Sequence, residues 1–126
     1  MYRYTAPLAA LLIATTLITT GSTAAFAHAE LKISMPEKNA TLKTAPTDVM
    51  IEFSEALNPK LSKIVVQDAK GKQVDKGDSM VDGGDPKHLM VDLNTLAAGT
   101  YKVTWTSVAA DDGHKLTGSF KFTVAP

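Results

Sequence analysis

The sequence contains no cysteine, so it has neither a disulfide nor a thiolate metal site. Its only arginine is Arg3, and beyond residue 27 twelve lysines face 13 acidic residues, a net charge of about −1. A chain without a clustered cationic face and without arginine forks lacks the usual means of binding phosphates, so nucleic acid is not an expected partner. The fold must be stabilised by packing alone, and any soft metal ligand must be a methionine.

Long apolar runs are also scarce, and the one at the N-terminus is short. Residues 6–20 are apolar but rich in threonine, and the run is shorter than the roughly 20 residues that a membrane-spanning helix needs. Arg3 precedes it, and Ala25-Phe26-Ala27 follows it with the small-x-small pattern that signal peptidase accepts. We predict a secretory signal peptide over residues 1–27, cleaved after Ala27, and one domain over residues 28–126. A retained anchor is the weaker alternative.

Beyond residue 30 the apolar residues recur mostly with a period of two, which is typical of strands with one buried face. About seven short strands separated by turn signals are expected, with no helical period of useful length. This pattern predicts an all-β fold, an immunoglobulin-like Greek-key β-sandwich or barrel. The expected strands lie near residues 31–35, 49–53, 63–67, 73–78, 89–93, 101–105 and 120–124.

Imidazole chemistry must come from the three histidines of the chain, His28, His88 and His114. If cleavage follows Ala27, His28 carries both a free α-amine and an imidazole, and the two nitrogens can close one chelate ring on a metal ion. Spacing alone supports two interpretations of His28 equally well: a metal ligand, or a histidine that begins the mature chain by chance. His88 is expected on the polar side of its strand, as a solvated surface residue.

A second pair of donors lies in Asp112-Gly113-His114, a predicted loop between two strands. A carboxylate and an imidazole two residues apart can face one ion when the backbone between them turns, and Gly113 permits such a turn. An ordinary hairpin turn with a solvent-facing histidine is the commoner origin of the same residues. Together with the two nitrogens of His28, however, these groups would form the N,O donor set that tetragonal Cu(II) prefers.

The methionines beyond residue 27 are scattered along the sequence, which gives little support to a thioether site for Cu(I). Ordinary packing is expected to explain most of them. The sequence also shows no Ser-His-Asp order, no phosphate-cradling glycine loop and no separated carboxylate pair. The methionines in question are Met35, Met50, Met80 and Met90.

In their order and spacing, several segments resemble the CopC family of periplasmic copper-resistance proteins. The resemblance implies a β-sandwich or barrel that binds one Cu(II) per chain through the amine and imidazole of His28, together with Asp112 and His114. It places Glu55 as a carboxylate near that ion. The segments are His28-Ala29-Glu30-Leu31, Ile51-Glu52-Phe53-Ser54-Glu55, Gly84-Asp85-Pro86-Lys87, Ala98 to Trp105 and Asp112 to Gly118.

Some family members also carry a methionine-rich loop with a nearby histidine that holds Cu(I) at the opposite end of the barrel. The corresponding stretch here, residues 65–81, contains only Met80 and no histidine, so the resemblance implies a protein that binds Cu(II) alone. We expect a periplasmic monomer, not an enzyme, that buffers copper or delivers it to a membrane importer of the CopD type. A histidine-brace copper oxidoreductase and a metal-free structural module are the alternatives.

Overall fold

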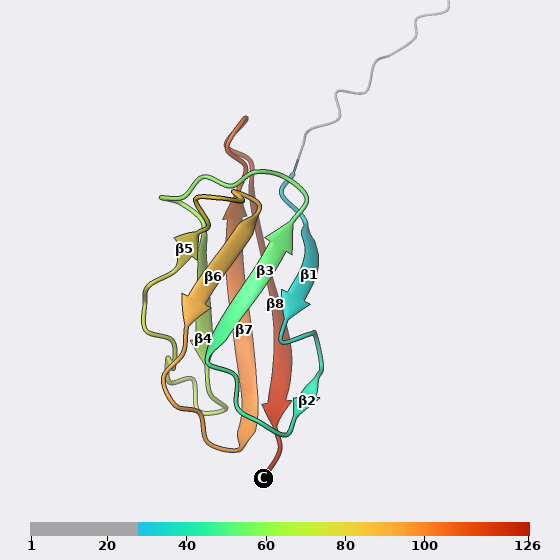
Figure 1. The fold of residues 1–126 in the computed structure, drawn as a ribbon, viewed down its shortest axis with the longest axis vertical. Helices are drawn as coiled ribbons and strands as arrows, with labels where there is room; N and C mark the ends of the chain where they lie inside the picture. Colours follow the sequence, from blue (N-terminus) through green and yellow to red (C-terminus); the bar gives the residue numbers. More distant parts are fainter. Residues whose placement is uncertain (1–27) are drawn as a thin grey trace, which may run out of the picture.

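The computed structural model describes residues 28–126, so the predicted signal peptide lies outside the described residues. These residues form eight strands in two four-stranded sheets (Figure 1). No helix among them is long and apolar enough to cross a membrane. The first sheet has the order β1 (Leu31–Met35), β3 (Asp48–Phe53), β6 (His88–Asp92), β5 (Met80–Val81). The second has the order β2 (Thr41–Leu42), β8 (Lys115–Val124), β7 (Gly99–Val108), β4 (Lys63–Gln67).

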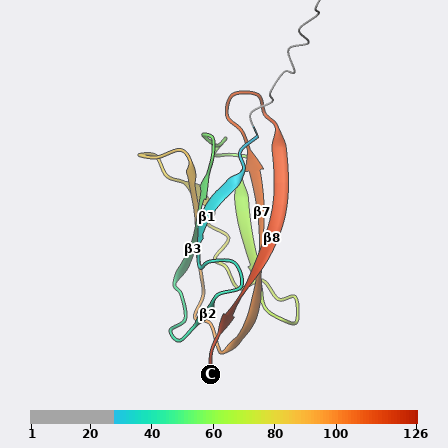
Figure 2. The same ribbon diagram turned by 90° about the vertical axis from the view of Figure 1, so that its right-hand side faces the viewer.

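The two sheets pack face to face, as the view along their edges shows (Figure 2). Every pairing is antiparallel except that of the short β2 with β8. This order matches that of immunoglobulin constant-type sandwiches, with β2 as an added strand. The Tyr101 hydroxyl donates a hydrogen bond to the carbonyl of Ala97, the contact that such sandwiches use to fix the corner before this strand. The predicted all-β sandwich is confirmed.

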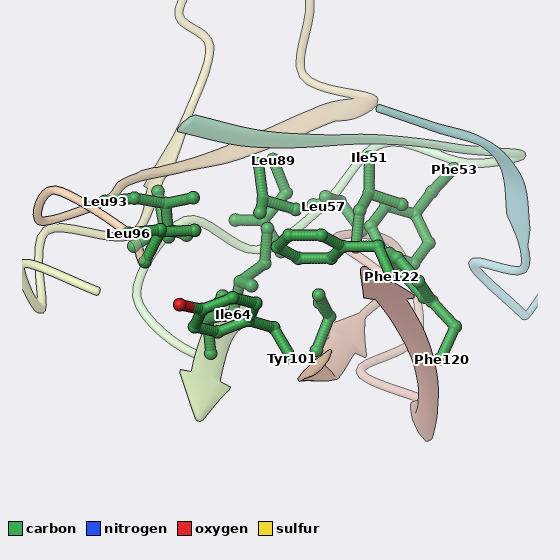
Figure 3. Packing of buried hydrophobic residues seen from close by; sticks show 14 of the residues in the cluster. Ile51, Phe53, Leu57, Ile64, Leu89, Leu93, Leu96, Tyr101, Phe120 and Phe122 are labelled. Carbon is green, nitrogen blue, oxygen red and sulfur yellow. The ribbon is translucent and has the colours of Figure 1, made fainter. Parts of the chain in front are cut away.

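The core lies between the sheets and is built by the alternation seen in the sequence (Figure 3). On β3, for example, Val49, Ile51 and Phe53 are fully buried while the residues between them face outward. Tyr101 stacks on Phe122 with ring centroids 5.4 Å apart. Burying such side chains is the main favourable term in folding, at roughly 1.5–3 kcal/mol each, so the absence of disulfides is compensated by packing.

The predicted strand at residues 73–78 is wrong, because this segment makes only isolated bridges. Asp75 is the physical reason. Its side chain is buried, and its carboxylate accepts hydrogen bonds from the backbone N–H groups of Val66 (2.8 Å) and Gly77 (3.0 Å). A side chain thus takes the place of strand partners along this edge of β4. The two-residue strands β2 and β5 were not predicted from the sequence either.

The methionines are scattered in the sequence but not in space, which corrects the sequence-based interpretation. Met35 on β1 is paired with Met50 on β3, Met50 with Met90 on β6, and Met90 with Met80 on β5. All four therefore stand in one row across the first sheet. We call this set the methionine row.

Candidate metal centre

Three segments of the chain meet at one end of the sandwich: the N-terminal residues 28–30, the start of the loop after β3, and the turn between β7 and β8 (Figures 1 and 2). The backbone N–H of Ala110 donates to the carbonyl of Ala56 at 2.9 Å, which ties the turn to the loop. The hydroxyl of Ser54 donates to the carbonyl of His28 at 3.0 Å, which ties the loop to the N-terminal segment. This end of the molecule is therefore a connected platform.

The backbone around His28 is fixed by two serines. Ser107, fully buried on β7, donates its hydroxyl to the carbonyl of Ala29 at 2.6 Å, and Ala29 is itself fully buried. Ser54 accepts a hydrogen bond from the N–H of Glu30 at 2.9 Å through its hydroxyl, and its own N–H donates to the Glu30 carbonyl at 2.8 Å. These hydrogen bonds hold the backbone of residues 28–30 in place. They therefore fix the position from which the His28 side chain extends.

Sequence reasoning did not identify these serines as positioning residues. A signal for Ser107 was present, because it continues the inward-facing series Tyr101, Val103, Trp105 on β7. A serine at a core position needs a hydrogen-bond partner, since an unsatisfied buried hydroxyl is costly. What the sequence could not show is that the partner lies 78 positions away.

The turn between β7 and β8 presents Asp112 and His114. Gly113 has φ +70°, a left-handed conformation that suits glycine, and its N–H donates to the carbonyl of Ala109 at 3.0 Å. One Asp112 oxygen accepts a hydrogen bond from the backbone N–H of His114 at 3.1 Å, and the other lies 2.7 Å from Nδ1 of the His114 ring. The side-chain hydrogen bond with His114 lowers the pKa of the Asp112 carboxyl below its ordinary value. The carboxylate in turn fixes the orientation of the imidazole.

The rings of His28 and His114 lie edge to face, with centroids 4.9 Å apart and an interplanar angle of 79°. Nδ1 of His28 is buried and has no hydrogen-bond partner among residues 28–126. A buried polar atom without a partner carries a desolvation cost, and in native proteins such an atom is explained by strain, by a functional role or by a bound water or ion. Nδ1 is also the ring nitrogen that closes a six-membered chelate with the α-amine of the same histidine. The residues present therefore fit a metal ion.

Within residues 28–126, no group of three or more His, Cys, Asp or Glu side chains is already arranged around one metal position. The Asp112 carboxylate contacts Nδ1 of His114. The α-amine of His28, a donor that is not a side chain, exists only in a chain that begins at that residue, because otherwise it is a peptide nitrogen.

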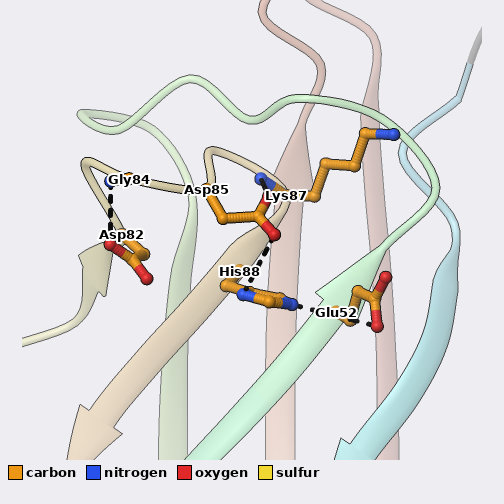
Figure 4. Close-up of polar contacts among 6 residues, drawn as sticks. All are labelled: Glu52, Asp82, Gly84, Asp85, Lys87 and His88. Atoms are coloured by element: carbon orange, nitrogen blue, oxygen red, sulfur yellow. Dashed lines mark hydrogen bonds and ion pairs between the residues drawn. The ribbon is translucent and has the colours of Figure 1, made fainter.

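The structure places the remaining predicted site residue, Glu55, directly after Ser54 at the start of the loop on this end, with a partly exposed side chain. Its role as a carboxylate near the ion stays a prediction. His88 lies on the polar side of β6, as predicted, but it is only partly solvated because two carboxylates lie beside it (Figure 4). Its side chain is only 25% exposed, with Nε2 3.8 Å from a Glu52 oxygen and Nδ1 3.4 Å from an Asp85 oxygen.

Comparison with known proteins agrees with the fold and shows the family. The model of the CopC domain family matches residues 31–125. The chain belongs to the CopC family. Copper resistance protein C of Escherichia coli is 36% identical over 107 residues, which cover 79% of this chain and 83% of that protein. The crystal structure of CopC from Methylosinus trichosporium OB3b superimposes with a TM-score of 0.73 at 30% identity, covering 79% of this chain and 95% of that one.

Another relative is much longer than this member of the CopC family. Copper transport protein CutJ of Bacillus subtilis (strain 168) is 33% identical over 100 residues, which are 79% of this chain but only 18% of CutJ. The sandwich described here thus corresponds to one part of that protein.

Proposed function

We propose that this CopC-family protein is exported, is cleaved after Ala27, and binds one Cu(II) ion at the end of the sandwich. The ligands are the α-amine and Nδ1 of His28, the imidazole of His114 and the carboxylate of Asp112. The observation that carries the proposal is the buried Nδ1 of His28, which has no partner among residues 28–126 and stands beside the His114 ring. Nitrogen and oxygen donors of this kind suit tetragonal Cu(II), which also binds such sites more tightly than Zn(II).

The Asp112–His114 hydrogen bond has a role in this proposal. An ionised carboxylate that faces Nδ1 requires the proton on that nitrogen, and a histidine held in this way uses Nε2 toward a metal. Asp112 orients the ring through this contact before the ion binds, and turns toward the ion to supply an oxygen when it binds. Glu55 supplies a further negative charge close to the ion. Bound copper provides a dipositive charge, and the chain provides the donors that hold it.

In cellular terms, we propose that the protein acts in the periplasm, where it sequesters copper or delivers it to a membrane importer of the CopD type. Two relatives are named for copper resistance and copper transport. Since the sandwich corresponds to a part of the longer copper transport protein CutJ, a separate domain of this kind is suited to hand copper to a transporter. We propose that it works as a monomer.

A carrier is favoured over a histidine-brace oxygenase by the surface of the described residues. Their exposed large hydrophobic side chains are Ile33, Met35, Leu61 and Met80, none of them aromatic. Trp105, which could have offered a flat face to a sugar, packs edge to face against Phe53 with centroids 5.2 Å apart. In addition, Asp112 as a ligand would occupy a copper coordination position that oxygen would need.

The test is a Cu(II) titration of protein purified from the periplasm, followed by electron paramagnetic resonance. The intact mass should first show a chain that begins at His28. We expect one tetragonal Cu(II) per chain, with hyperfine splitting from coupled nitrogens. A mature chain that begins elsewhere, or a spectrum without nitrogen coupling, would overturn the proposed ligand set.

A further inference from the structure

The methionine row is on the outer face of the first sheet. Residues paired directly across neighbouring strands point to the same face, so the pairings place all four thioethers together. The face is settled by the neighbours of Met50 and Met90, which are fully or almost fully buried and therefore point into the core. Those neighbours are Val49, Ile51, Leu89 and Val91. The row comprises every methionine of residues 28–126.

Core packing does not explain this row. Met35 is 60% exposed and Met80 57% exposed, while Met50 and Met90 between them are half-buried. The outer face of the second sheet shows what solvent-facing positions of this protein otherwise carry. Its rows across β4, β7 and β8 are mostly hydroxyl and lysine side chains: Lys63, Thr106 and Thr117; Val65, Thr104 and Ser119; Gln67, Lys102 and Lys121.

Carboxylates surround the methionine row. A groove of about 260 Å³ beside it is lined by Met80 and Met90 together with Asp48, Asp78 and Asp92. The negative charge of Asp78 raises the pKa of Asp92 above its ordinary value, and the cation of Lys76 opposes this effect only in part. On the opposite side of the row, Glu52 is paired with His88. A cation held over the row would lie between these negative charges and would offset the repulsion.

The spacing of the row suits a single ion. Cβ atoms of directly paired residues are about 5 Å apart, so three successive methionines span roughly 10 Å. Each side chain has three rotatable bonds, and its sulfur is separated from Cβ by one methylene, so the outer two of three can lean over the central one. Thioether sulfur is a soft ligand that selects Cu(I) over Cu(II) or Zn(II). The backbone pairing thus preorganises soft donors that would otherwise be far apart in the sequence.

We propose that the methionine row binds one soft monovalent d10 cation, Cu(I) or Ag(I), through the thioethers of Met50, Met90 and one flanking methionine. This site is separate from the proposed Cu(II) centre and does not depend on it. It replaces the sequence-based expectation that the protein has no thioether site.

The test titrates the protein with Ag(I), and anaerobically with Cu(I), while the methionine methyl groups are followed by ¹H–¹³C NMR. We expect one equivalent to bind per chain and to shift the methyl signals of Met50 and Met90. The double variant M50L/M90L, which keeps apolar volume but removes two sulfurs, should bind at least about tenfold more weakly. Unchanged methyl signals in the native protein would overturn the proposal.

Two control variants show whether the row itself holds the soft ion. Adding Leu61→Met to M50L/M90L returns a methionine to the exposed turn at residue 61 but not to the row, so tight binding should not return. His28→Ala removes the proposed Cu(II) centre and should leave Ag(I) binding intact. Binding that survives M50L/M90L but disappears with His28→Ala would assign the soft ion to the other site and refute the row.

Discussion

The end of the sandwich and the outer face of its first sheet offer donor atoms of opposite character. At the end, nitrogen and oxygen donors on His28, His114 and Asp112 are brought together by the N-terminal segment and a tight turn. On the face, sulfur donors are aligned by strand pairing alone. The first set suits Cu(II) and the second suits Cu(I). The proposed Cu(II) site requires a chain that begins at His28, whereas the methionine row depends only on the register of the sheet.

Extending the mature chain by one glycine before His28 should have the largest effect. The imidazole is kept, but its neighbouring amine becomes an amide nitrogen and the chelate ring is lost. We expect Cu(II) affinity to fall more than roughly 100-fold, because changes to groups that only support the ligands already cost 10–100-fold. Competition titration against a Cu(II) chelator measures this, with His88→Ala as the matched control that should change little. Ag(I) binding to the methionine row should be unaffected.

Acidification should have the next largest effect, because it should weaken Cu(II) binding at the end of the sandwich much more than Ag(I) binding at the methionine row. Protons compete with the metal for the imidazoles and the α-amine, so Cu(II) affinity should fall as the pH is lowered from about 8 to about 5. The lowered pKa of Asp112 keeps its carboxylate charged throughout this range, and that charge is lost only below the ordinary range of aspartate. Asp112→Asn should therefore weaken Cu(II) binding at every pH of this range. Thioethers do not titrate, so Ag(I) binding should depend much less on pH.

Ser107→Ala tests whether Cu(II) binding at the end of the sandwich depends on the buried hydrogen bond between Ser107 and Ala29. The substitution removes the hydroxyl that donates to the Ala29 carbonyl and leaves that buried oxygen without its partner. We expect the free energy of unfolding to fall by about 1–3 kcal/mol and Cu(II) affinity to fall a few-fold. Urea unfolding and copper titration give the two values. Thr106→Ala, the outward-facing neighbour on β7, is the control; an equal loss there would mean that Ser107 has no special role.

The smallest effect on the Cu(II) centre is expected from substitutions in the methionine row. M50L/M90L should leave Cu(II) affinity and the electron paramagnetic resonance spectrum of the copper centre unchanged, since neither methionine is among the proposed ligands of that centre. The same variant should shift unfolding by less than about 1 kcal/mol, because leucine replaces methionine with similar volume at half-buried positions. A changed Cu(II) spectrum would show that the two regions share one ion.

Several features of this protein were predicted correctly because they are encoded locally. Alternation at positions such as Val49, Ile51 and Phe53 predicted the buried strands, and Asp112-Gly113 predicted the turn that carries His114. Errors arose where a side chain from elsewhere replaced a backbone partner. Asp75, for example, reads as part of a polar strand but instead binds the edge of β4 with its carboxylate.

The sequence by itself determined the strand alternation, the all-β class and the identity of the candidate donors. Only the tertiary structure decided which donors meet. The ring of His28 reaches His114 because Ser54 and Ser107 fix the N-terminal backbone, and the methionines align because β1, β3, β6 and β5 pair in one register. The physical reason is that the pairing of distant strands is set by the global packing of both sheets, and a register shift of one residue would turn each side chain to the opposite face.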